Sequence, residues 1–196
     1  NAGMIDSQGR TKTDNVDAFK PRGLFTICAN GRDSTASHRD CLLPSGRVGS
    51  VFSRKILLSH YRMVGKLMGI AIRSDMPISL CLAPVVYKGI LGVPLCWADV
   101  CEVDDFVSKF IEKLEAGVEG WEHLFKDSVP VWGVLDGAGR YVNIDGDHSS
   151  MRTLDPQDIP KYISTVKAYR IHEHDDAIAA LREGINGIVP LSALTF

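Results

Sequence analysis

Five cysteines and six histidines are the residues of this chain best suited to nucleophilic, redox or metal chemistry. The cysteines form no CxxC pair, keep no regular spacing and are odd in number: Cys28, Cys41, Cys81, Cys96 and Cys101. This pattern favours reduced thiols and a cytoplasmic chain over a disulfide framework. A zinc site would need four clustered ligands. The sequence supplies only separate pairs: His38 with Cys41, Cys96 with Cys101, and His172 with His174. We therefore expect neither a metal nor another cofactor.

Short motifs for other known chemistries are missing from the sequence. It contains no GxSxG, no HExxH and no P-loop. The glycines in residues 137–139 lack the third glycine and following helix of a nucleotide loop, and the acidic segment 143–147 lacks the spacing and closing Glu of a calcium loop. Cys81 and Cys96 stand between apolar residues, which predicts core thiols of low nucleophilicity. The residues alone therefore favour a protein-binding module over a small-molecule enzyme.

The composition is that of an ordinary soluble globular domain. Its 196 residues are 45% hydrophobic and 23% charged, and the net charge of -2 argues against a nucleic-acid-binding face. The first fifteen residues contain neither an apolar signal core nor an initiator Met, so we expect no secretory signal and a chain that begins inside a longer protein. We expect neither nucleic acid nor membrane among its partners.

The longest patterned apolar stretch, residues 57–92, must contribute much of the core. Its first half repeats apolar residues at helical spacing, which predicts a core helix over about 54–74. Charged residues interrupt this helix too often for a bilayer span of ~20 apolar residues. Gly65 and Gly69 lie one turn apart and expose backbone that another element can approach closely.

Shorter elements are expected on both sides of this helix. Apolar runs at 23–28 and 41–43 suggest a hairpin-like lead-in, and two β-rich runs at 131–135 and 140–144 flank a turn. Further helices are expected to begin near Pro84, Asp104, Asp158 and Asp175. The predicted fold class is α+β and mainly helical, with a larger helical part formed by 1–100 and 155–196 and a small hairpin-containing subdomain at 101–154.

Several sequence blocks, in this order, resemble the N-terminal lobe of a HECT-type ubiquitin ligase. Residues 61–92 (YRMVGKLMGIAIRSDMPISLCLAPVVYKGILG) carry the main likeness: an aromatic before an apolar residue and Gly, a second Gly, then P-[IL]-x-L and a short helix started by Pro. The likeness runs from about residue 3 to 196 and within the family is nearest to the very large HERC-type ligases. The other blocks are ANGR at 29–32, HRDCLL at 38–43, YRIHE at 169–173 and LREGINGIVP at 181–190.

The resemblance implies a role in ubiquitin transfer. A HECT ligase accepts ubiquitin from a conjugating enzyme (E2) as a thioester on a C-lobe cysteine in a Thr-Cys-Phe-like context, and then passes it to a substrate lysine. None of the five cysteines here has that context, so no catalytic residue is expected in this chain and the C-lobe is taken to be absent. The implied partners are an E2 ubiquitin-conjugating enzyme, ubiquitin and the C-terminal HECT lobe.

The resemblance also implies an E2-binding groove, in which a small subdomain receives an aromatic loop of the E2. Phe106 and Phe110 match an apolar pair on one helix of this groove, Val129 matches the following strand, and Tyr162 and Val166 match the closing helix. Each of these residues fits a core equally well, because an apolar stripe is more often core than interface. The alternative to an E2-binding lobe is a non-catalytic helical adaptor or scaffold module, a degenerate HECT relative.

Overall fold

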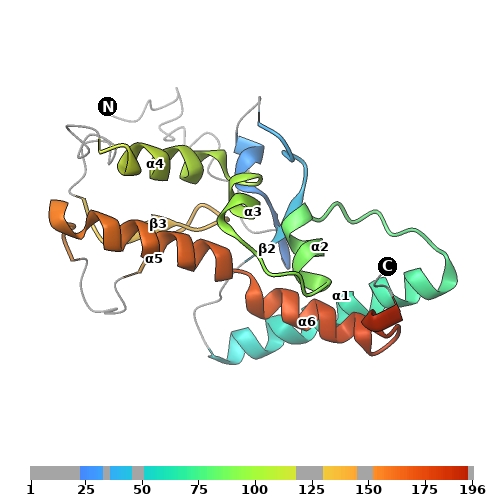
Figure 1. Cartoon of the computed structure of the whole chain (residues 1–196). Coiled ribbons are helices and arrows are strands. Elements are labelled where there is room, and N and C mark those ends of the chain that lie inside the picture. The colour runs from blue at the N-terminus through green and yellow to red at the C-terminus, as the bar shows by residue number, and fades with distance from the viewer. Residues whose placement is uncertain (1–22, 33–35, 46–50, 118–129, 145–151, 194–196) are drawn as a thin grey trace, which may run out of the picture.

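Helices carry most of the fold, and two short antiparallel strand pairs complete an α+β architecture (Figure 1). The computed structural model describes residues 23–32, 36–45, 51–117, 130–144 and 152–193. The elements in chain order are β1 (Phe25–Ile27), η2 (Ala29–Arg32), β2 (Leu42–Pro44), α1 (Val51–Ser74), α2 (Pro84–Ile90), α3 (Trp97–Cys101), α4 (Asp105–Glu115), β3 (Gly133–Leu135), β4 (Tyr141–Asn143), η4 (Pro156–Asp158), α5 (Ile159–His172), α6 (Asp175–Asn186) and η5 (Leu191–Ala193).

Helices α1 and α6 lie side by side although they come from distant parts of the chain (Figure 1). Glycines allow this close approach. A Cβ at Gly65 would meet the backbone of Leu181 and Gly184, and a Cβ at Gly69 would meet the side chain of Ile188. The close approach predicted from the spacing of Gly65 and Gly69 is confirmed, and α6 is the element that uses it.

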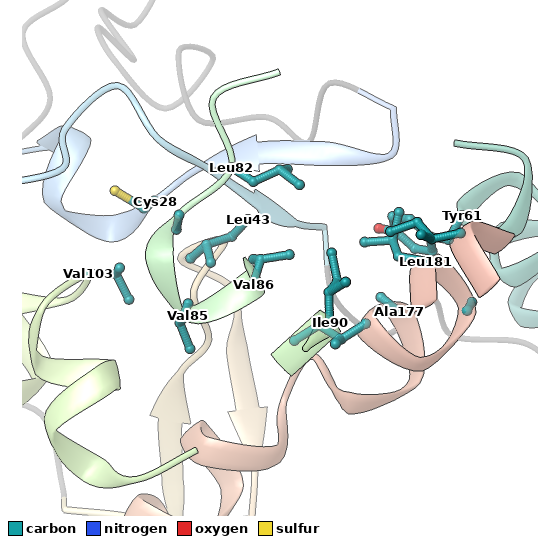
Figure 2. Close-up of a cluster of buried hydrophobic side chains, with 14 of the residues drawn as sticks. Cys28, Leu43, Tyr61, Leu82, Val85, Val86, Ile90, Val103, Ala177 and Leu181 are labelled. Carbon is teal, nitrogen blue, oxygen red and sulfur yellow. The ribbon is translucent and has the colours of Figure 1, made fainter. Parts of the chain in front are cut away.

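The first hydrophobic core lies between α1, α6, α2 and the β1–β2 pair, as Figure 2 shows. The two strands pair antiparallel with Thr26 opposite Leu43, so the expected lead-in hairpin is present. Tyr61 of α1 anchors the strands to the helix, because its hydroxyl donates to the carbonyl of Leu24 and accepts from the amide of Ser45 at 3.0 Å. Fully or almost fully buried members include Cys28, Leu43, Tyr61, Leu82, Val86, Ile90 and Leu181.

A second hydrophobic core lies between α3, α4, α5 and the β3–β4 hairpin. The hairpin pairs Gly133 with Asn143 and Leu135 with Tyr141, and its turn contains Gly139 at a φ of 78°. Buried members include Val100, Val107, Ile111, Trp132, Val134, Leu154, Tyr162 and Val166. Helix α5 thus packs in this core, whereas α6 packs in the first. The sequence predicts both helices in one helical part, 155–196, whereas in the structure they pack in different cores.

Two cysteines are placed differently from the sequence expectation. Cys81 and Cys96 are exposed rather than core thiols. In the extended segment before α2, Leu82 takes the buried side and Cys81 the opposite one. Cys96 stands at the start of α3, where its amide donates to Asp99 Oδ2 at 2.7 Å. Apolar neighbours in sequence therefore did not bury either thiol.

The remaining elements agree with the sequence patterns at the level of position and type. Asp104 caps α4 as expected, and Pro84 occupies the first turn of α2. The five-residue helix α3 was not anticipated. Across the described ranges, no helix combines the length and apolar character needed to cross a bilayer.

Candidate functional site

Helix α4 is the element that presents the candidate site. Its first turn is fixed by Asp104, whose Oδ1 accepts a hydrogen bond from the amide of Val107 at 3.0 Å. Val107, Ile111 and Leu114 follow at helical spacing and are buried in the second core. The cap and the fully buried core positions of α4 are therefore formed by residues other than Phe106.

Phe106 and Phe110 lie one helical turn apart on α4, in different environments. Phe106 is 59% exposed, whereas Phe110 is half-buried against the second core. Burying a whole Phe side chain is favourable by roughly 1.5–3 kcal/mol, and Phe106 leaves most of that free energy unused within this chain. The outer member of this aromatic pair, Phe106, is therefore mostly exposed.

The other predicted site residues lie beneath this surface or outside the described ranges. Tyr162 and Val166 of α5 are only 1% and 0% exposed, and both pack in the second core. The Tyr162 hydroxyl donates to the carbonyl of Gly133 at 2.7 Å. Its ring meets the Trp132 ring edge-on, with 5.9 Å between the ring centroids. Burial raises the pKa of the Tyr162 hydroxyl. These side chains support α4 from below and do not reach the surface. Val129 lies outside the described residues.

A buried group of charges joins α4, α5 and the hairpin, and sequence reasoning missed it. Arg170 Nη2 lies 3.0 Å from Asp104 Oδ2, and Arg170 Nε lies 2.9 Å from Glu173 Oε2. All three side chains are at most 5% exposed. Arg170 also donates to the carbonyl of Leu135 at 2.7 Å, and Glu173 accepts from the amide of Gly137 at 2.8 Å. These contacts hold the hairpin turn against the start of α4.

The chemistry of this charged group favours a structural role. Both carboxylates lie within ion-pair distance of the Arg170 guanidinium, and Glu173 also accepts from the amide of Gly137, so the buried charges compensate one another. His174 lies beside it, and burial lowers the pKa of its imidazole, which keeps the ring neutral. The sequence signal that could have found the group is the Arg–Glu pair, three residues apart, in the block YRIHE. In the described part of the chain, no three His, Cys, Asp or Glu side chains gather to hold a metal ion.

Comparison with known protein families identifies the family to which the chain belongs. The family model described as HECT-domain (ubiquitin-transferase) matches residues 16–196. The chain belongs to this HECT family. Its relatives include the E3 ubiquitin-protein ligases HERC2 of Homo sapiens and of Mus musculus, each 36% identical over 177 residues, and the probable E3 ubiquitin-protein ligase HECTD4 of Homo sapiens, 26% identical over 205 residues.

These relatives are far longer than this HECT chain. In each comparison the match covers 88% of this chain, but it covers only 3% of either HERC2 protein and 5% of HECTD4. The family-model match and the identity with the two HERC2 proteins confirm, at the level of the family, the HERC-type resemblance of the sequence blocks.

The sequence blocks that carry the HECT resemblance lie at contacts that build the fold. In the block at 29–32, the buried Asn30 side chain donates to the carbonyls of Ser37 and Glu102 and accepts from the amide of Asp105. The block at 181–190 contains Gly184 of the α1–α6 contact, and the block at 169–173 contains both Arg170 and Glu173. These HECT-like blocks therefore specify packing and the placement of α4, whereas the exposed aromatic lies outside them.

Proposed function

We propose that this chain is the part of a HECT-type ubiquitin ligase that binds the E2, with Phe106 and Phe110 at the centre of the docking surface. Family membership and the similarity to HERC2 support a part in ubiquitin transfer. The observation that carries the docking role is Phe106, which is 59% exposed on a helix whose cap and core contacts are made by other residues.

In the proposed docking surface, one exposed aromatic side chain stands on a helix that packs against the second core. Phe106 is free to meet a loop of the E2, and Phe110 connects it to the second core. Tyr162 and Val166 hold α5 under α4, and Val129 contributes the strand side of the groove in this proposal. Exposed aromatics on rigid elements are the residues that most often dominate binding energy at protein interfaces.

The proposed chemistry asks this chain to bind and orient. Ubiquitin arrives as a thioester on the E2, moves to a cysteine in a C-terminal lobe and is then passed to a lysine of the substrate. A docking lobe contributes by bringing the two reacting centres together, which lowers the entropic part of the barrier. The nucleophile belongs to the other lobe, consistent with the lack of an activated cysteine motif in this sequence.

Titration calorimetry of the chain against a panel of ubiquitin-conjugating enzymes tests the proposal. We expect saturable binding to at least one of them, and its loss when the aromatic residue of that enzyme's docking loop is replaced by Ala. A conjugating enzyme for a different ubiquitin-like modifier is the control and should not bind. If no ubiquitin-conjugating enzyme binds, the proposal fails and the alternative of a non-catalytic adaptor module is favoured.

A further inference from the structure

Two cysteines that are 40 positions apart in sequence meet at the edge of the first core. The sulfurs of Cys41 and Cys81 are 3.6 Å apart. The backbone holds them together, because the amide of Leu42 donates to the carbonyl of Cys81 at 2.7 Å and the amide of Ala83 donates to the carbonyl of Leu42 at 2.9 Å. The two segments form a parallel bridge at Leu42 and Leu82, directly after the cysteines.

This backbone arrangement suits a covalent bond between the sulfurs. Paired strands lie about 4.8 Å apart, which is within the Cα separation of roughly 4.4–6.8 Å that disulfides need. The sulfurs must approach from 3.6 Å to a bond length of about 2.05 Å, a movement of the size that side-chain rotation supplies.

Exposure and acidity give the two thiols different roles. Cys81 is exposed, whereas Cys41 is partly buried. Burial, together with the neighbouring Cys81 thiol, raises the pKa of Cys41 to about 11, so Cys41 forms little thiolate at neutral pH. A third thiol, Cys28, is fully buried and donates to the carbonyl of His38 at 2.9 Å. An oxidant in solution therefore reaches Cys81 first.

We propose that Cys41 and Cys81 form a peroxide-sensitive dithiol, with Cys81 as the reacting thiol and Cys41 as the resolving one. The Cys81 thiol loses its proton, its thiolate attacks a peroxide oxygen, the O–O bond breaks, and a sulfenic acid and a hydroxide form; the hydroxide takes up the released proton and becomes one water. The Cys41 sulfur then attacks the Cys81 sulfur, the S–O bond breaks, and a second water leaves. Two thiols lose two electrons and two protons, and one hydrogen peroxide becomes two waters.

The disulfide would tie β2 to the segment that enters α2 and enclose the whole of α1 in a covalent loop. Such a loop restricts the unfolded chain more than the folded one, so oxidation should raise Tm by roughly 5 °C. The inference does not depend on the proposed E2 docking.

The test treats the reduced 196-residue chain with increasing hydrogen peroxide, blocks remaining thiols with an alkylating agent and maps peptides by mass spectrometry. We expect a Cys41–Cys81 cross-linked peptide, lighter by two hydrogens and restored by dithiothreitol, together with the rise in Tm. In Cys41→Ser, dimedone should instead trap a sulfenic acid on Cys81. Cys96→Ser, which removes another exposed thiol, is the matched control and should cross-link as the unaltered chain does.

Three results would overturn the proposal. The first is oxidation of Cys96 or Cys101 to the same extent as Cys81, with no cross-linked peptide. The second is direct conversion of Cys81 in the unaltered chain to the sulfinic acid. The third is a cross-linked chain whose Tm equals that of the reduced chain. Each of these three results is measured on the unaltered chain. The test therefore stands even if the Cys41→Ser variant fails to fold.

Discussion

Gly65 of α1 and Gly184 of α6 face each other across the helix pair, and neither has room for a side chain. A Cβ built on Gly65 would lie 3.0 Å from the Cα of Gly184, and one built on Gly184 would lie 2.9 Å from the Cα of Gly65. The obstructing atoms are backbone and cannot rotate away. This contact sets the distance between the two helices that enclose the first core.

Gly184→Ala should destabilise the chain despite the better helix propensity of alanine. The new methyl group would collide with the Arg62 carbonyl and the Gly65 backbone and force α1 and α6 apart. Overpacking costs about 1–3 kcal/mol, and the gain of up to about 1 kcal/mol in helix propensity offsets part of it. We expect a net loss of about 1–2 kcal/mol in the free energy of unfolding, measured by urea denaturation.

Gly187→Ala is the matched control for this substitution. It lies one turn further along the chain at a φ of -69°, and its new Cβ would meet only ordinary contacts at 3.5 Å or more. Its stability should equal or slightly exceed that of the unaltered chain. Equal losses for the two alanine variants would contradict the account of the helix contact.

Arg170→Leu should be among the most destabilising substitutions in the chain. It leaves the carboxylates of Asp104 and Glu173 buried without their counterion. Breaking a buried pair in this way typically costs about 3–5 kcal/mol. Arg62→Leu is the control, because its pair with Glu183 is 43% and 62% exposed and should contribute less than about 1 kcal/mol. Chemical denaturation of both variants measures the difference, and similar losses would count against a structural role for the buried group.

His174 should make the folded chain less stable below about pH 6.5, the usual pKa of histidine. Burial lowers the pKa of His174 in the folded state, with Glu173 acting in the opposite direction and Arg170 reinforcing the decrease. The unfolded chain therefore binds a proton as the pH falls through about 6.5, while the folded chain does not, so the equilibrium shifts towards unfolding. The stabilising contribution of the neutral, buried His174 ring is therefore fully present above about pH 6.5 and is lost as the pH falls below it.

Replacement of this histidine tests the sign of the effect. His174→Gln should flatten the decline in unfolding free energy between pH 7.5 and 5.5, where one group contributes at most about 1.4 kcal/mol per pH unit. His172→Gln is the control, since His172 is 67% exposed and pairs with Asp175 at 2.8 Å. A decline that is just as steep in His174→Gln as in the unaltered chain would show that His174 does not cause it.

Local sequence patterns predict most of the fold because they act over one or two turns of chain. The cap at Asp104, the proline at the start of α2 and the glycines of the hairpin each depend on backbone geometry nearby. The partner of Arg170 and the exposed side of Cys81 depend instead on segments far away in sequence. No periodicity within one element identifies such partners.

The candidate site shows the same limit. Helical spacing places Phe106, Phe110 and Ile111 on one broad apolar face, but it does not say which edge of that face remains uncovered. In the structure, Ile111 is buried, Phe110 is half-buried and Phe106 is exposed, so the uncovered edge is the one that carries Phe106. For this reason Phe110→Ala should lower both folding stability and E2 binding, whereas Phe106→Ala separates the two effects.

The affinity of Phe106→Ala for an E2, measured by titration calorimetry, tests the docking proposal most directly. Met63→Ala is the matched control, because Met63 is also 59% exposed but lies on α1. Loss of an aromatic anchor costs about 2 kcal/mol or more, which is roughly a 30-fold weaker affinity. The account predicts that loss for Phe106→Ala, unaltered affinity for Met63→Ala and a Tm close to that of the unaltered chain in both. An unaltered affinity in Phe106→Ala would contradict it.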